Sequence, residues 1–143
     1  MSGAGRAWID GASRGNPGDA GFGVLFEAEG GEEEILGYLG RTTNNVAEYA
    51  GLLAALARGS RAGLDRLTVL SDSELLVRQM EGSYRVKAPH LVPYFLAALK
   101  LRRSISRFSI RHVRRGENSR ADGLANRAID ERAPLPAWLD LPG

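Results

Sequence analysis

The segment from Asn45 to Gly59 limits the fold more than any other part of this sequence, because it predicts a helix without a solvent-facing side. Between Val46 and Ala57 the only charged residue is Glu48. A helix that is apolar nearly all round has to be buried over most of its surface. The chain must therefore supply other elements that cover this helix.

The remaining pattern predicts an α/β fold. Short runs with β-branched or alternating apolar residues predict strands at 6–12, 20–29, 33–42, 66–71 and 107–114. Longer periodic runs predict helices at 45–59, 73–81, 90–103 and 119–131. The three opening strands indicate an antiparallel meander, whereas strands that follow helices indicate parallel crossovers. We expect a mixed sheet with helices on its faces.

The length of 143 residues favours one domain with a sizeable core. We divide the chain into a body, 1–132, and a Pro-rich tail, 133–143. The tail reads as extended, but Trp138, Leu139 and Leu141 predict that it docks on the body.

Composition excludes several kinds of chemistry. The chain has no cysteine and only two histidines, which excludes disulfides, thiolate catalysis and zinc sites built from cysteine. A bound metal would be held mainly by oxygen, which favours Mg²⁺ or Mn²⁺. No apolar run has the length of a membrane span and the N-terminus lacks a signal-peptide hydrophobic region, so we expect a cytoplasmic protein.

Charge is unevenly distributed along the chain. The net charge is +2, yet residues 100–120 are strongly basic and residues 27–35 are acidic. A basic stretch is typical of nucleic-acid binding, and an Arg-rich solvated surface is the alternative interpretation.

Four acidic residues occupy similar places in the predicted elements. Asp10 and Asp72 each follow an apolar strand-like run, and Asp72 directly precedes a helix. Glu48 shares a helix face with Leu52, and Asp122 lies on the same face as apolar residues of the last helix. Strand ends and helix starts are where α/β folds bind ligands.

Helix capping is the alternative interpretation of three of these acids. Asn45-x-x-Glu48 and Ser119-x-x-Asp122 both fit the capping-box pattern, and either Asp72 or Ser73 fits an N-cap. Four clustered carboxylates would raise one another's pKa, a cost that divalent cations remove. Two Mg²⁺ ions bridged by carboxylates form a site suited to phosphodiester hydrolysis.

Four motifs in order, "DGASRGNPG", "RTTNNVAEYAGLLAAL", "LSDSELLVRQMEGSY" and "HVRRGENSRADGLANRA", resemble type 1 ribonuclease H from about residue 6 to residue 131. The resemblance implies a ribonuclease H-like fold, a five-stranded mixed sheet with helices on both faces, and makes 1–132 the catalytic domain. It implies cleavage of the RNA strand of RNA/DNA hybrids by two Mg²⁺ or Mn²⁺ ions, leaving 5′-phosphate and 3′-hydroxyl ends. The implied metal ligands and catalytic acids are Asp10, Glu48, Asp72 and Asp122.

The same resemblance implies further roles. His112 matches a histidine that assists proton transfer or product release, for which a mobile imidazole is suited. Contacts to the RNA strand are implied for Asn16, Asn44 and Asn45, and contacts to a DNA-strand phosphate for Arg41 and Thr43. Asn is also a preferred turn and N-cap residue, so the structural reading of each Asn stays open.

The chain departs from many family members in one region. Where those members carry a long basic protrusion, this sequence has only "MEGSYRVKAPHLVPYFL". Hybrid affinity then rests on the sheet face, Arg41 and the basic segment at Arg111, Arg114 and Arg115. The missing protrusion opens double-stranded RNA as a second substrate class. We expect a monomer, and the alternatives are a non-catalytic hybrid- or dsRNA-binding domain and a different phosphoesterase on this scaffold.

Overall fold

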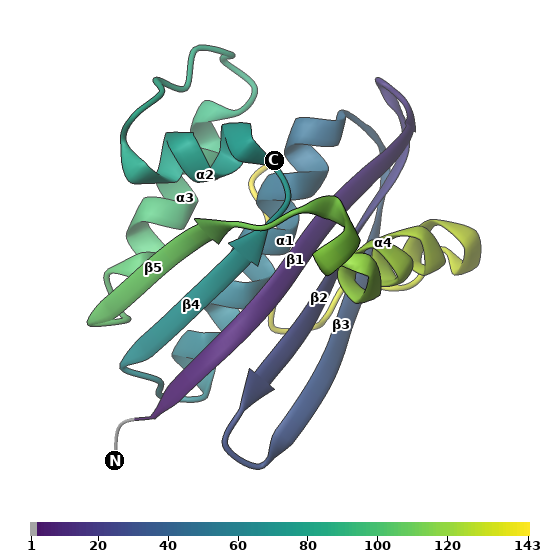
Figure 1. The fold of residues 1–143 in the computed structure, drawn as a ribbon. Helices are drawn as coiled ribbons and strands as arrows, with labels where there is room; N and C mark the ends of the chain where they lie inside the picture. The colour runs from purple at the N-terminus through teal and green to yellow at the C-terminus, as the bar shows by residue number, and fades with distance from the viewer. Residues whose placement is uncertain (1–2) are drawn as a thin grey trace.

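A computed structural model describes residues 3–143 as an α/β fold (Figure 1). The strands are β1 (Ala4–Gly15), β2 (Gly18–Ala28), β3 (Gly31–Thr42), β4 (Arg66–Ser71) and β5 (Arg107–His112). The helices are α1 (Asn44–Arg61), α2 (Glu74–Glu81), α3 (Val92–Arg102) and α4 (Ser119–Glu131), with a short 3₁₀ helix, η1 (Arg115–Glu117). Every strand and α-helix predicted from the sequence is present, with ends shifted by a few residues at most places.

The strands form one five-stranded sheet in the order β3-β2-β1-β4-β5. β1, β2 and β3 pair antiparallel, as expected for an opening meander, whereas β4 pairs parallel with both β1 and β5. The expected mixed sheet of the ribonuclease H-like fold is therefore confirmed.

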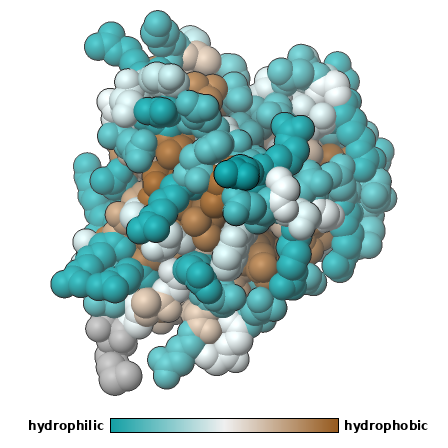
Figure 2. Space-filling model, in the orientation of Figure 1, coloured by the Kyte–Doolittle hydropathy of each residue, from teal (hydrophilic) through white to brown (hydrophobic). Residues whose placement is uncertain are grey.

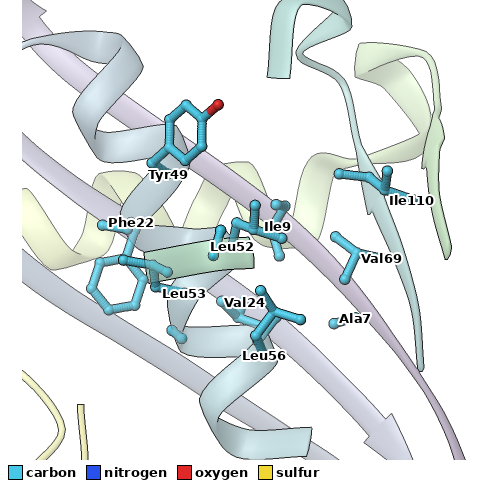
Figure 3. Packing of buried hydrophobic residues seen from close by; sticks show 14 of the residues in the cluster. Ala7, Ile9, Phe22, Val24, Tyr49, Leu52, Leu53, Leu56, Val69 and Ile110 are labelled. Atoms are coloured by element: carbon cyan, nitrogen blue, oxygen red, sulfur yellow. The ribbon is translucent and has the colours of Figure 1, made fainter. Parts of the chain in front are cut away.

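Helices cover the two faces of the sheet unequally. α1 packs on β1, β2, β3 and β4, with α2 and α3 beside it on the same face, while α4 alone packs on the other face, against β1, β2 and β3 (Figure 1). Most of α1 is buried, as its composition predicts. Figure 3 shows Leu52, Leu53 and Leu56 of this helix packed against Ile9 and Val24 of the sheet. In residues 3–143, no helix combines the length and apolar character needed to cross a lipid bilayer.

The position of Asp10 in its strand differs from the sequence prediction. β1 does not end there: it continues to Gly15 and is paired with β2 from Gly5 to Gly15. What ends next to Asp10 is the pairing of β1 with β4 on its other side, because the last paired residues are Ile9 and Ser71. Asp10 therefore lies where the parallel half of the sheet ends, and the glycine-rich turn comes later.

The tail docks on the body, as its apolar residues predicted. The carbonyl of Ala133 accepts a hydrogen bond from the Tyr38 N–H of the edge strand β3, at 2.8 Å. Further along, Leu139 is buried in the core and Trp138 packs against it. The Tyr94 hydroxyl of α3 then donates to the Pro142 carbonyl at 3.4 Å. The tail thus passes from α4, around the β3 edge, to the helices of the opposite face.

Candidate active site

One pocket brings together all four acidic residues singled out in the sequence. It lies where β1 and β4 stop pairing and encloses about 320 Å³. Its lining residues are Asp10, Gly11, Ala12, Ser13, Asn44, Glu48, Asp72, Arg115 and Asp122. Residues that are far apart in the chain therefore meet at one end of the sheet.

Two glycines let the helices that carry Glu48 and Asp122 approach the sheet closely. A Cβ atom on Gly11 would lie 2.3 Å from the backbone nitrogen of Glu48, so α1 rests on the bare strand at this point. Gly23 pairs with Asp10 in the sheet, and a Cβ atom there would lie 2.6 Å from the Ala121 carbonyl of α4. The chain therefore uses glycine on both faces, beside Asp10, to bring the other acids within reach of it.

The helix caps are supplied by residues other than the acids. Thr43 caps α1, since its hydroxyl accepts from the Val46 N–H at 3.2 Å. The alternative reading of Asn45-x-x-Glu48 as a capping box is wrong, because the N-cap is Thr43, two residues before Asn45, and Glu48 lies beyond the third helical position. The acid is left free to face the pocket.

The same holds at the two other helix starts. Ser73 caps α2 by accepting from the Leu76 N–H at 3.2 Å, which leaves Asp72 outside the cap. The Ser119-x-x-Asp122 capping box is also wrong: Asn118 occupies the N-cap position of α4, and no side chain caps this helix. Capping therefore does not account for Glu48, Asp72 or Asp122.

Burial and neighbouring charge make Asp10 difficult to ionise. Its side chain is 8% exposed. Desolvation by burial, the nearby carboxylate of Asp72, and a shared hydrogen bond with Asp122 together with its charge raise the pKa of Asp10 to about 8. The carboxyl groups of Asp10 and Asp122 are thus close enough to share one proton.

Glu48 is perturbed in the same direction. Burial raises the pKa of Glu48 to about 7, and the charge of Asp72 adds to this rise. The Ser73 hydroxyl opposes it by donating a hydrogen bond to Glu48 Oε1 at 3.1 Å. Ser73 therefore both caps α2 and stabilises the ionised form of a carboxyl group in α1, a double role that the sequence pattern did not indicate.

Asn118 ties α4 to the strand that carries Asp10. It is only 1% exposed, and its amide nitrogen donates to the carbonyl of Ile9 at 2.8 Å. Its amide oxygen is buried without a partner among the described residues. The bond to Ile9 positions the start of α4 relative to β1.

The residues predicted to contact substrate lie at different distances from the pocket. Asn44 lines it, and the side-chain Oδ1 of Asn16 accepts a hydrogen bond from the Asn44 backbone N–H at 3.0 Å, so these two are adjacent. Thr43 is engaged as a cap, while Arg41 is exposed near the end of β3 and Asn45 is half-buried at the start of α1. The end of β3 that carries Arg41 pairs with the start of β2, beside the β1–β2 turn that holds Asn16.

His112 does not line the pocket, whereas Arg115, which was not predicted as a site residue, does. His112 is exposed at the end of β5, paired in register with Ser71, and it does not line the pocket. Arg115 does line the pocket. The sequence identified Arg115 only as part of a basic stretch, and its place between His112 and Asp122 is the signal that could have located it.

The donor set suits a hard divalent cation. All four candidate ligands offer carboxylate oxygens, and burial together with the neighbouring carboxylates raises the pKa of Asp10, a cost that a bound cation would offset. Among residues 3–143, no three Asp, Glu or His side chains enclose a point closely enough to hold an ion as they stand. The carboxylates line a shared pocket without forming a closed ligand shell.

Comparisons with known proteins identify the family. A family described as reverse transcriptase-like matches residues 9–128. A ribonuclease H of Pelobacter propionicus is 35% identical over 143 residues, covering 90% of this chain and 86% of its own. The crystal structure of ribonuclease H1 from Halobacterium salinarum superimposes with a TM-score of 0.85 at 40% identity, covering 90% of this chain and 99% of that one. The chain belongs to the ribonuclease H1 family.

Two further family members extend the comparison. The structure of LC11-RNase H1 in complex with an RNA/DNA hybrid matches with a TM-score of 0.82 and 41% identity, over 89% of this chain and 97% of that one. The bifunctional protein Rv2228c of Mycobacterium tuberculosis is 43% identical over 131 residues, which are 90% of this chain. This ribonuclease H1 chain spans only 36% of the length of Rv2228c and 64% of the ribonuclease HI of Halobacterium salinarum.

Proposed function

We propose that this chain is a divalent-metal-dependent endoribonuclease that hydrolyses the RNA strand of RNA/DNA hybrids to 5′-phosphate and 3′-hydroxyl ends. The observation that carries the proposal is the single pocket lined by Asp10, Glu48, Asp72 and Asp122, none of which caps a helix. The relative crystallised with an RNA/DNA hybrid supports this substrate class.

The four carboxylates are the proposed metal ligands. Two Mg²⁺ or Mn²⁺ ions, when bound, activate the attacking water and stabilise the leaving oxygen. The protein prepares for this with Asp10 and Glu48, whose raised pKa values mean that they release protons as the ions bind. Bound cations would therefore relieve the repulsion between the clustered carboxylates, and this relief favours metal binding.

Substrate contacts are proposed around the pocket entrance. Asn16, Asn44 and Asn45 face the RNA strand in this proposal, because amide groups can both donate to and accept from a 2′-hydroxyl. The contact between Asn16 and Asn44 supports a joint role for them. Arg41 and Thr43 are proposed to hold a phosphate of the DNA strand. His112, exposed and close in register to the strand end before Asp72, is proposed to assist proton transfer.

Cleavage of one labelled sequence presented as RNA/DNA, RNA/RNA, single-stranded RNA and DNA/DNA tests the proposal, with Mg²⁺, Mn²⁺ or EDTA in each case. We expect metal-dependent cuts in the RNA strand of the hybrid. Cuts in RNA/RNA as well would extend the substrate class to double-stranded RNA. Binding of hybrid without any cleavage, by folded protein in either metal, would contradict the proposal and favour a non-catalytic binding domain.

The Asp10→Asn variant localises the activity to the pocket. It keeps the size of the side chain but removes its charge, so we expect turnover to be lost while the circular dichroism spectrum is unchanged. Asp140→Asn, at an exposed position in the tail, is the matched control and should cleave normally.

A further inference from the structure

The face of the sheet that α4 leaves open carries a row of basic side chains outside the pocket. α4 covers β1, β2 and β3, and within residues 3–143 no α-helix packs on this side of β4 or β5 (Figure 1). Leu67, Val69 and Ile110 point to the core on the opposite side. Strand alternation therefore exposes the intervening residues, which we call the basic face: Arg66, Thr68, Leu70, Arg107, Ser109 and Arg111.

The basic face is a shallow hollow and not a set of scattered side chains. A hollow of about 310 Å³ is lined by five of its residues together with Phe108. The Ser109 hydroxyl donates to the Thr68 hydroxyl at 3.2 Å, joining the two strands in the middle. Figure 2 shows this side of the molecule, where hydrophilic side chains lie over β4 and β5 with apolar surface between them.

The arginines of the basic face repel one another in the folded protein. Arg66 and Arg107 are direct partners in the parallel pairing of β4 with β5. Like charges directly opposite each other on one sheet face destabilise it. Among the described residues, no carboxylate pairs with Arg66, Arg107 or Arg111. The acid that borders this side, Glu27, is already paired with Arg6 at 2.6 Å. An anionic ligand would supply the missing counter-charge.

The basic face leads to the candidate active site. Arg111 lies one residue before the end of β5, and Arg115, a few residues further along, lines the pocket itself. At about 3.3 Å per residue, Arg107 and Arg111 lie about 13 Å apart on the same face of β5, with Ser109 between them. A polyanion that leaves the pocket on this side meets a cation at each end of the hollow.

The width of this open face favours a single strand over a duplex. The floor spans β1, β4 and β5, which is about 10 Å across at about 4.8 Å per strand, and α4 stands along one side. Arginine and hydroxyl groups contact phosphates without reading bases, and a positively charged groove that follows the backbone is one element of sequence-independent single-strand binding.

We propose that the basic face binds the phosphates of a single-stranded nucleic-acid segment that continues from the duplex in the pocket. This inference rests on the proposed function for the duplex, but the face itself can be assayed alone. Phosphates are common to RNA and DNA, so the experiment carries both kinds of extension.

The test compares a blunt RNA/DNA hybrid with the same hybrid carrying an extension of about ten nucleotides, of RNA or DNA, at either end. The variant is Arg66→Gln/Arg107→Gln, and the control is Arg61→Gln/Lys100→Gln, which removes the same charge from exposed positions on helices of the other face. We expect the wild-type protein to have a lower KM for at least one extended hybrid than for the blunt one. The variant should lose this difference while its kcat and KM for the blunt hybrid stay at the wild-type values.

Direct binding separates this proposal from the nuclease proposal. Fluorescence anisotropy with a labelled single-stranded oligonucleotide, titrated at several salt concentrations, needs no cleavage. Loss of two phosphate contacts should make the slope of log affinity against log salt shallower by about 1.4, at about 0.7 per contact. If the wild-type protein does not cut blunt hybrid, the proposed function fails, and the anisotropy measurement still decides on the basic face.

Three results would overturn the inference. The first is an equal KM ratio and equal salt slope in wild type and variant. The second is an equal loss in the Arg61→Gln/Lys100→Gln control. The third is a loss of affinity for blunt hybrid as large as for extended hybrid, which would mean that the face contacts duplex. Thermal unfolding verifies folding, and relief of the Arg66–Arg107 repulsion should leave the variant at least as stable as wild type.

Discussion

The side-chain amide nitrogen of Asn118 lies 2.8 Å from the backbone carbonyl oxygen of Ile9, and this hydrogen bond joins the start of α4 to β1. Ile9 precedes Asp10 in β1, and Asn118 precedes the helix that carries Asp122. Because both partners are buried, the distance between these two carboxylates is held by an interaction that the solvent does not reach.

Asn118→Ala is therefore expected to reduce catalysis through position. Leaving the Ile9 carbonyl without its partner should cost about 1 to 3 kcal/mol in the free energy of unfolding. A displaced Asp122 should lower kcat roughly tenfold or more, with a smaller change in KM. Thermal unfolding and steady-state kinetics measure both effects, and Ser119→Ala at the exposed neighbouring position is the control. A purely structural role would lower the melting temperature but leave kcat unchanged below it.

Asp10 makes stability depend on pH in a defined direction. Its pKa is raised from 3.8 to about 8, so the folded state holds this proton more tightly than the unfolded state does. Stability from this group is therefore present below the unfolded value and is lost as pH rises from about 4 to about 8. Without divalent metal, Asp10→Asn should be more stable than wild type at pH 8.5 and above, on the order of 2 kcal/mol.

Metal should reverse this difference. Mg²⁺ is expected to raise the melting temperature of the wild-type protein more at high pH than at pH 6, and to have little effect on Asp10→Asn. Calorimetry with and without EDTA makes the comparison, with Asp140→Asn following wild type. An Asp10→Asn variant that is destabilised without metal at pH 8.5 would show that Asp10 does not carry the electrostatic cost inferred for it.

Ser73 links a helix cap to the ionisation of Glu48. Ser73→Ala should lose about 1 kcal/mol of stability from the cap of α2. It should also raise the pKa of Glu48 above its value of about 7, because the hydrogen bond that favours the ionised form is gone. Activity should then fall more at pH 6.5 than at pH 9. Ser73→Thr retains a hydroxyl and should restore both properties, whereas a uniform loss across pH would contradict the link to Glu48.

Gly11 tests whether close approach of α1 is needed. Gly11→Ala places a methyl group 2.3 Å from the Glu48 backbone nitrogen, so α1 must move, and we expect a loss of about 3 kcal/mol or more. Gly123→Ala, in a helix with no atom within 4 Å of the new methyl group, should gain about 0.5 to 1 kcal/mol. Chemical denaturation compares the two, and similar effects for both would contradict the close packing.

The fold could be predicted from the sequence because its signals are local. The apolar helix at 45–59 and the alternation in the strands depend on neighbouring residues, and such patterns predicted all five strands and four α-helices, with some ends shifted by a few residues. The residue at which two strands stop pairing is not a local property. That Asp10 lies beside the end of β4 depends on the length of another strand, which the pattern of β1 alone does not show.

The candidate site was predictable in its acids but not in its supporting contacts. The N-cap of α1 is Thr43, two residues before Asn45, and this shift removes Glu48 from the capping-box position that the pattern suggested. The bond from Asn118 to Ile9 joins residues 109 apart, and the place of Arg115 in the pocket depends on the path of a loop. Such contacts are set by tertiary packing and leave no periodic trace in the sequence.

The docking of the tail also has a consequence for self-association. β3 is an edge strand, and unpaired edges recruit strands from other molecules. The Ala133 carbonyl accepts a hydrogen bond from the Tyr38 N–H of this strand. The Leu135 side chain packs so close to Gly37 that a Cβ atom on Gly37 would lie 2.7 Å from it. The tail therefore covers part of the β3 edge. Removing the tail would uncover both apolar surface and an open hydrogen-bonding edge, the combination from which aggregates grow.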